Sequence, residues 1–262
     1  MSVSIEEFVR IVETAAPKEL AYDWDNSGLL LRCGDTVSRV LIALDATMAV
    51  AQEAREKGCD MLLVHHPLIF SPIKALSAQN SADAVLMTLI RAGISLYAAH
   101  TSFDRAAGGI NDALAQKLGL ISISAVLGDG ESLMRVGELE PSLDKEAFIA
   151  RVKTALGVST VRVSASACAR VARAAVVGGS GSDFVRAAKN AGAQALVTGE
   201  AKHHHFIEAA AAGLLLIEAG HYHTECAFTD RIDMSLQSYV NEVQLDLGLM
   251  KAENDKAPYA FE

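Results

Sequence analysis

The sequence lacks three features that would each indicate a different class of protein. No apolar run approaches the roughly 20 uninterrupted apolar residues that a helix needs to cross a membrane. No C-x-x-C pair occurs, because the four cysteines (Cys33, Cys59, Cys168 and Cys226) are isolated from one another. No basic excess exists either: 23 Lys and Arg against 32 Asp and Glu give a formal charge of −9.

Each absence narrows the possible functions. Isolated cysteines in an intracellular chain are expected to be reduced thiols, most of them in the core. The acidic balance argues against a nonspecific nucleic-acid surface, which needs clustered Lys and Arg, although a metal ion or a local patch could still hold a nucleotide. The segment MSVSIEEFVRIVE is typical of a capped amphipathic helix and not of a signal peptide. We therefore expect a cytoplasmic protein with no membrane partner.

Short apolar runs alternate with helical patterns along the chain. Strands are predicted at 38–47, 61–66 and 94–100, with helices at 47–58, 81–93 and 108–119 between and after them. Apolar strands that alternate with helices predict a largely parallel sheet covered on both faces. The fold class expected is α/β, with two α/β lobes, mixed but largely parallel sheets covered by helices, and a metal site in the cleft between the lobes.

The same alternation begins again after residue 125. Strands are predicted at 134–140, 161–166, 172–179, 195–199 and 214–220, and helices at 142–157, 182–192, 202–213 and 223–243. The predicted domains are a discontinuous first lobe of residues 1–125 plus 221–262 and a second lobe of residues 126–220. The segment GDGESL at 128–133 is the predicted hinge.

The eight histidines are confined to three short neighbourhoods. These are LVHHPLIF around His65 and His66, AAHTSFDRAAGG around His100, and the stretch from KHHHF to GHYHTECAF. Histidine is the commonest metal ligand and titrates near neutral pH. Its confinement therefore indicates one metal-dependent site built from distant segments.

Two of these neighbourhoods follow predicted strands. His65 and His66 lie at the end of one strand before Pro67, and His100 ends the next, with Asp104 four residues later. Ligands bind at the carboxyl ends of strands in open α/β sheets. The alternative for the histidine pair is a polar end to a strand, and for His100 and Asp104 a local turn hydrogen bond.

His221 and Glu225 are four residues apart at the start of the last predicted helix. This spacing places both side chains on one helix face, where they could bind a single ion. The alternative is a helix start with an acidic first turn. His65, His66, Asp104, His221 and Glu225 are thus the predicted metal ligands.

Five imidazole and carboxylate ligands without a thiolate indicate a catalytic site and not a closed structural zinc site. They exceed what one tetrahedral ion needs, so two divalent ions per subunit are predicted, with zinc, manganese, iron, cobalt and nickel all compatible. Such a pair lowers the pKa of bound water and stabilises a developing oxyanion. The predicted chemistry is hydrolysis with metal-bound hydroxide as the nucleophile.

The chain resembles the Nif-three-like family of dinuclear-metal-centre hexameric proteins, labelled GTP cyclohydrolase 1 type 2 homologues. The resemblance rests on segments in the same order along the chain: WDNSGLLL, HHPLIF, HTSFDRAAGGIND, GGSGSDF, TGEAKHH and AGHYHTE. It implies the same five metal ligands, two α/β lobes and a toroidal homohexamer. Glu200 is a departure, because the family often has Asp there.

The resemblance also bears on the remaining candidates. It places His203 and His204 at the pocket, where they could transfer protons, while His100 could face the pocket or orient Asp104. A solvated helix start is the alternative for the first two. The GGSGS segment could hold phosphate on its backbone N–H groups or form a plain tight turn. Trp24, the only tryptophan, could stack a base or pack in a core or interface.

The function predicted is a dinuclear metal-dependent hydrolase, GTP cyclohydrolase 1 type 2-like. Its substrate would be a small molecule that is nucleotide-like or carries a cyclic C–N or phosphoester bond. The alternative is a hexameric assembly that binds or handles metal, or regulates a partner, without turnover.

Overall fold

The computed structural model describes residues 2–126 and 133–260, and the predicted hinge at 128–133 lies outside them except for Leu133. The chain divides into two compact units. Unit 1 comprises residues 1–109 and 228–256, and unit 2 comprises residues 110–227 and 257–262. Among the described residues, no helix combines the length and apolarity needed to cross a bilayer.

These bounds differ from the predicted boundaries at 125/126 and 220/221. The reason is visible in the contacts of two helices, α5 (Ile110–Lys117) and α9 (His221–Glu225). α5 packs against strands β8 and β10 of unit 2 and also contacts α9. Both helices therefore belong to unit 2, although the sequence pattern grouped them with the first lobe.

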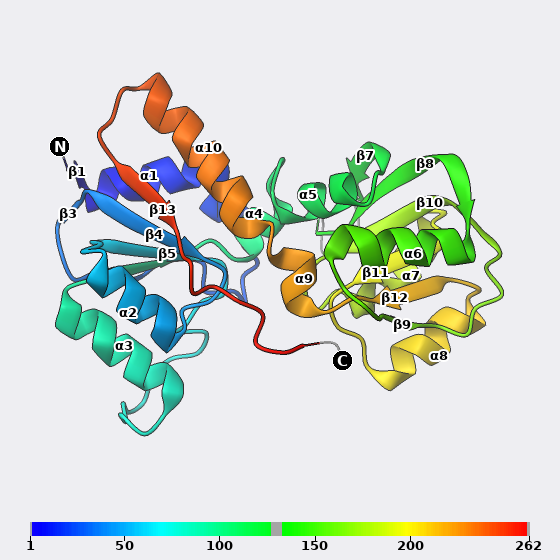
Figure 1. Cartoon of the computed structure of the whole chain (residues 1–262), viewed down its shortest axis with the longest axis horizontal. Coiled ribbons are helices and arrows are strands. Elements are labelled where there is room, and N and C mark those ends of the chain that lie inside the picture. Colours follow the sequence, from blue (N-terminus) through cyan, green and yellow to red (C-terminus); the bar gives the residue numbers. More distant parts are fainter. Residues whose placement is uncertain (1, 127–132, 261–262) are drawn as a thin grey trace. The chain divides into compact units, whose positions relative to one another are not determined.

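Unit 1 is a five-stranded sheet between two pairs of helices (Figure 1). The strand order is β13-β4-β5-β6-β2, in which only the pairing of β2 with β6 is antiparallel. The elements of this unit are β1 (Val3–Ser4), α1 (Ile5–Ala15), η1 (Lys18–Leu20), β2 (Gly28–Leu31), β3 (Thr36–Val37), β4 (Arg39–Ala43), α2 (Met48–Glu56), β5 (Met61–Val64), α3 (Ser81–Ala92), β6 (Ser95–Ala98), α4 (Thr101–Arg105), α10 (Phe228–Glu242) and β13 (Gly248–Lys251).

Unit 2 is a six-stranded mixed sheet in the order β7-β8-β10-β11-β12-β9. Strands β10, β11 and β12 are parallel, and β7, β8 and β9 pair antiparallel to their neighbours. Besides α5 and α9, its elements are β7 (Ile121–Ala125), β8 (Arg135–Asp144), α6 (Lys145–Leu156), β9 (Arg162–Val163), β10 (Arg170–Val177), η2 (Ser182–Phe184), α7 (Val185–Asn190), β11 (Ala195–Thr198), α8 (His203–Ala211) and β12 (Leu215–Glu218).

Alternate side chains of the central strands explain why helices cover both faces of the unit 2 sheet. Val197 of β11 packs into a core with α5 and α6, whereas its neighbour Leu196 packs into a separate core with α7 and α8. Successive side chains of a strand point to opposite faces, so an uninterrupted apolar strand needs cover on both. The predicted α/β class, with mixed sheets covered by helices, is confirmed.

One predicted element is divided in the structure. The sequence predicts a single helix over 223–243, but α9 ends at Glu225 and α10 begins at Phe228. The division separates the units, since α9 belongs to unit 2 and α10 to unit 1. Phe228 is buried, and its ring lies 5.5 Å from that of Phe103 in unit 1.

Candidate metal centre

In unit 1, three parallel strands end in polar residues at the same edge of the sheet. Asp45 follows β4, His65 and His66 follow β5 directly, and His100 comes two residues after β6. One nitrogen from each of His65, His66 and His100 lies within 4.8 Å of the other two. The structure therefore brings together the three imidazoles that the sequence placed at strand ends.

The buried His65 ring is held by the backbone. Its Nδ1 lies 2.9 Å from the carbonyl oxygen of Ala99, and its ring centroid is 5.2 Å from that of Phe228. Because a carbonyl oxygen only accepts hydrogen bonds, Nδ1 must carry the hydrogen. The other ring nitrogen, Nε2, lies 3.8 Å from Oδ1 of Asp104. This distance is too long for a hydrogen bond and short enough for both atoms to bind one ion.

The other two imidazoles of unit 1 are held by carboxylates. His66 Nδ1 lies 2.9 Å from Oδ1 of Asp45, and His100 Nδ1 lies 2.7 Å from Oδ1 of Asp25. Carboxylate partners of this kind fix the orientation and tautomer of metal-binding histidines. Asp25 and Asp45 were not predicted as site residues, although Asp45 ends an apolar strand as His65 does.

Asp25 stays ionised in a fully buried position. Burial alone would raise its pKa, but hydrogen bonds from His100, Ser27 and Thr101 outweigh burial and hold the pKa well below its usual range. The Oγ atoms of Ser27 and Thr101 are each 2.6 Å from Oδ2. An ionised Asp25 can only accept from His100, so Nδ1 of His100 is the donor.

Unit 2 carries the second set of predicted ligands, on α9 directly after β12. His221 Nε2 lies 2.9 Å from Oε2 of the buried Glu225. His221 Nδ1 lies 3.0 Å from Oε1 of Glu200, and Oε2 of Glu200 accepts from Ser180 Oγ at 2.8 Å. Burial raises the pKa of Glu200, but the hydrogen bonds from Ser180 and His221 outweigh it and lower the pKa.

The glycines of the GGSGS segment let α9 approach the sheet. A Cβ on Gly179 would lie 2.2 Å from Oε1 of Glu225 and 3.0 Å from Nε2 of His221, and a Cβ on Gly178 would lie 3.1 Å from Cγ of Glu225. The N–H groups of this segment already donate to side chains: Gly178 to Asn111, Gly179 to Thr224 and Gly181 to Thr198. The segment is thus a close-packing turn, and these N–H groups are not directed at a phosphate.

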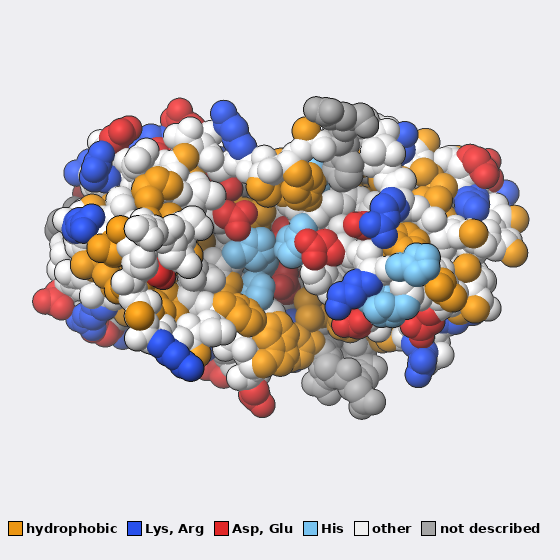
Figure 2. Space-filling view, turned by 90° about the horizontal axis from the view of Figure 1, so that it is seen from below, with side chains coloured by type: hydrophobic (Ala, Val, Ile, Leu, Met, Phe, Trp, Pro, Cys, Tyr) orange, Lys and Arg blue, Asp and Glu red, His pale blue; other side chains and the backbone are white. Residues whose placement is uncertain are grey.

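The three histidines that open α8 differ in burial. His203 and His204 are exposed, whereas His205 is buried between Lys202 N, which donates to its Nδ1, and Asp183, which is 2.9 Å from its Nε2. Exposed histidines are visible at the surface in Figure 2. Within residues 2–126 and 133–260, no group of three donors close enough to hold an ion includes an α8 histidine.

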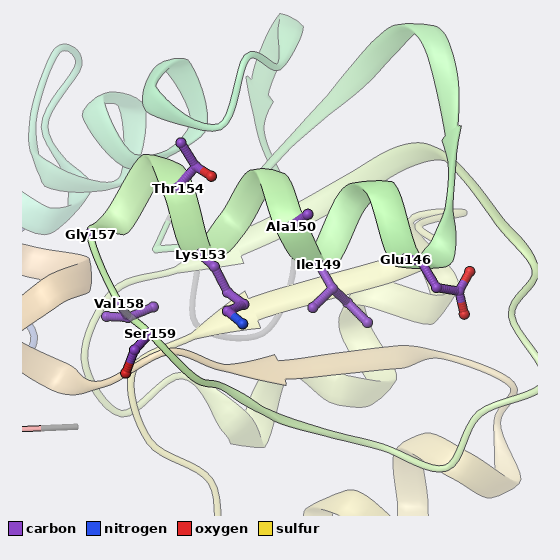
Figure 3. Close-up of a pocket in the computed structure, with 8 residues that line it drawn as sticks. All are labelled: Glu146, Ile149, Ala150, Lys153, Thr154, Gly157, Val158 and Ser159. Carbon is purple, nitrogen blue, oxygen red and sulfur yellow. The ribbon is translucent and has the colours of Figure 1, made fainter. Parts of the chain in front are cut away.

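A separate cavity of about 630 Å³ lies beside α6 in unit 2. Ile149 and Lys153 of α6 point toward the segment that carries Val158 and Ser159 (Figure 3). Its lining contains none of the predicted site residues, so this cavity is distinct from the candidate metal donors.

A family model described as Duf34/NIF3 (NGG1p interacting factor 3) matches residues 3–258. The chain belongs to this family. The resemblance inferred from the sequence is therefore confirmed. A relative from Lactococcus lactis, named GTP cyclohydrolase 1 type 2 homolog, is 34% identical over 263 residues, which cover 99% of each chain. A Clostridium acetobutylicum protein of the same name is 29% identical over 269 residues, covering 100% of each.

A solved structure has the same fold along nearly the whole chain. The Staphylococcus aureus hypothetical protein SA1388 matches with a TM-score of 0.91 and 27% identity, covering 99% of each chain. The similarity extends through both units.

Proposed function

We propose that this NIF3-family chain is a dinuclear metal-dependent hydrolase. His65, His66, Asp104, His221 and Glu225 would together bind two divalent ions of zinc, manganese, iron, cobalt or nickel. One observation carries the proposal: in each unit the candidate histidines have Nδ1 held by a carbonyl or carboxylate, which leaves Nε2 as the nitrogen that could bind an ion. Metal-binding histidines are generally held in this way by their outer partners. In His221, Nε2 lies 2.9 Å from Glu225, its proposed co-ligand.

The donor chemistry fits metal ions. Imidazole nitrogens and carboxylate oxygens are ligands that zinc and the other divalent first-row metals share. In unit 1, His65 Nε2 and Asp104 Oδ1 face each other at 3.8 Å, and in unit 2, Gly179 leaves space beside Glu225 that a Cβ would fill. In each unit, the proposed ligands therefore include donor atoms that could bind a cation.

Chain connectivity supports a joint role for the two sets. Glu225 precedes Phe228 by three residues, and the Phe228 ring packs against His65 at 5.2 Å. Three residues span at most about 11 Å of extended chain. The two sets of donors are thus joined by a short stretch of chain, and the joint role is proposed on this connection.

When bound, two ions activate water and stabilise the negative charge that develops during hydrolysis. The chain's own residues would orient the ligands, because Ala99, Asp45 and Glu200 hold the histidine rings in place. The exposed His203 and His204 and the half-buried His100 are proposed as pocket residues that bind substrate or transfer protons. A nucleotide-like substrate with a cyclic C–N or phosphoester bond is proposed from the family's names.

Metal analysis and a substrate panel test the proposal together. We expect about two ions per chain in protein purified without added metal, and fewer in His65→Ala and Glu225→Ala. Nucleotides, phosphodiesters and cyclic amidines should then be assayed with metal-loaded protein. His223→Gln is the matched control, because His223 shares α9 with both unit 2 ligands and is not a proposed ligand.

The outcomes separate catalysis from metal handling. Hydrolysis that is lost in both ligand variants and kept in the His223 control supports the hydrolase. Hydrolysis that persists in both metal-depleted variants contradicts it, and tight ion binding without turnover of any substrate favours a metal-handling or regulatory assembly.

We also propose a toroidal homohexamer, on the family resemblance. Light scattering should then give six times the chain mass of 27.7 kDa. A monomer mass at micromolar concentration contradicts this assembly and leaves the metal proposal open to its own test.

A further inference from the structure

An exposed cluster of aromatic rings lies beside the imidazoles of unit 1. Tyr22 and Trp24 come from the segment between η1 and β2, and Phe70 comes from the segment between β5 and α3. Trp24 is 60% exposed and Phe70 is 51% exposed, so neither belongs to the core. Hydrophobic side chains (orange) border histidine side chains (pale blue) at the surface in Figure 2.

The indole of Trp24 is fixed on one face. Its ring stacks on Tyr22 with centroids 5.4 Å apart and an interplanar angle of 17°. The guanidinium of Arg105 lies 4.5 Å from the centre of the same Tyr22 ring. Both groups cannot occupy one face of Tyr22, so the three side chains form a stack that ends in Trp24. Tyr22 thus covers one face of the indole, and Trp24 as a whole remains 60% exposed.

Phe70 and His100 border this indole. The Phe70 ring lies 6.2 Å from Trp24 at an angle of 46°, and the His100 ring lies 6.4 Å from Trp24 at 78°. Asn26 Nδ2 donates to the carbonyl of Ile69, which joins the segment carrying Trp24 to the segment carrying Phe70. The aromatic surface is therefore held in place before any ligand arrives, which lowers the entropy lost on binding.

His100 connects the aromatic surface to the candidate metal donors. Its ring is 5.1 Å from His65 and 5.8 Å from His66. A flat molecule stacked on Trp24 would thus extend past a single imidazole to reach the donors that we propose to bind metal. A rigid tryptophan face can stack on any of the nucleobases, because every nucleobase has a π face.

We propose that Trp24 and Phe70 form a stacking subsite for the planar heteroaromatic ring of the substrate, the kind of ring that a nucleobase provides. This inference rests on the proposed function, because it places the ring next to the reacting centre. It specifies the substrate class that this site accepts: a flat base linked to the group that the metal site attacks.

Trp24 is the only tryptophan of the chain, so its fluorescence reports on this surface directly. Guanosine and adenosine, which lack phosphate, should quench the emission saturably in chelator-treated and in manganese-loaded protein, whereas ribose should not. Equilibrium dialysis should show nucleoside binding about five- to thirtyfold weaker in Trp24→Ala and close to wild type in Trp24→Phe. Phe70→Ala should weaken it by a smaller factor.

Met234→Ala is the matched control, because Met234 is 64% exposed on α10 of the same unit. It should leave nucleoside binding unchanged. Thermal melts of all variants check that each is folded, and the exposed positions make loss of the fold unexpected.

Two results overturn the inference. If millimolar nucleoside leaves the Trp24 fluorescence unchanged in protein that still binds metal through His65 and Glu225, the stacking subsite is contradicted and the proposed function is not. Emission that changes with protein concentration and not with nucleoside identifies the aromatic surface as a contact between copies. Quenching by nucleosides with no metal bound in any form supports the subsite and contradicts the metal proposal.

Discussion

Oε1 of Glu200 lies 3.0 Å from Nδ1 of His221. The other nitrogen of that ring is 2.9 Å from Glu225, so one imidazole joins two carboxylates. Glu200 follows β11 and His221 follows β12, two neighbouring parallel strands. Glu200 thus contacts a proposed ligand from the end of a neighbouring strand.

Removing the Glu200 carboxylate should weaken metal binding without removing a ligand. We expect Glu200→Ala to lower metal affinity by roughly 10- to 100-fold, since outer partners of ligating histidines have effects of this size. Competition with a fluorescent chelator measures the affinity. Glu200→Asp keeps a carboxylate and should restore most of it; equal losses in both variants would show that His221 is not oriented by this charge.

Gly179 should be intolerant of a side chain. Gly179→Ala places a Cβ 2.2 Å from Glu225 Oε1 at a φ of +59°, so we expect a loss of about 2–4 kcal/mol in unfolding free energy and a loss of metal binding. Gly213→Ala is the control, because Gly213 has a φ of +67° with nothing within 4 Å of its added Cβ. That variant should lose only about 1–2 kcal/mol. Equal losses in chemical denaturation would show that the close contact is not what matters.

The pH dependence of stability should include a contribution from Glu53 on α2. Burial raises its pKa, but hydrogen bonds from Lys57 and from the backbone N–H groups of Glu253 and Asn254 prevail and lower the pKa to about 2, from a usual 4.5. Because the folded pKa is the lower one, this stabilisation is complete above pH 4.5 and disappears as the pH falls toward 2.

Glu53→Gln should therefore reduce the unfolding free energy at pH 7 by about 1–3 kcal/mol and flatten its decline in acid. Urea titrations at several pH values measure both effects. Glu56→Gln, an exposed substitution on the same helix, is the control. A Glu53 variant whose acid profile overlays that of wild type would contradict the assignment.

Metal removal should lower thermal stability if the proposed ligands bind ions only in the folded chain. At a free ion concentration 100 times the dissociation constant, binding stabilises the fold by about 2.7 kcal/mol, or roughly 5–10 °C in a chain of this size. Calorimetry with and without a chelator measures the shift. His65→Ala should show little shift, and a full shift in that variant would mean that the ions bind elsewhere.

The sequence predicted the strand ends that carry donors because apolar runs and polar residues alternate there clearly. β5 ends at Val64, directly before His65, and β12 ends three residues before His221. Asp25 and Asp45 could not be assigned in the same way. Their roles depend on a hydrogen bond to a histidine 75 or 21 residues away, which no local pattern encodes.

Some of the fold was also hidden from local patterns. β13 is only four residues long and pairs with β4, which lies about two hundred residues earlier in the chain. The sequence pattern is helical without interruption over 223–243, so it gives no sign of the break between α9 and α10. The new helix begins at Phe228, the residue at which the chain returns to unit 1 and becomes buried there. Long-range pairing and burial, rather than propensity, set these features.

Unit 1 is made of two separate stretches of chain, residues 1–109 and 228–256, which are synthesised at different times. Residues 110–227 of unit 2 emerge from the ribosome before α10 and β13, which complete the unit 1 core and its sheet edge. Domains generally fold as units during synthesis, so the inserted unit is expected to fold while the first 109 residues still lack their final strand. During that interval the unpaired edge of β4 is available to a chaperone or to a wrong partner.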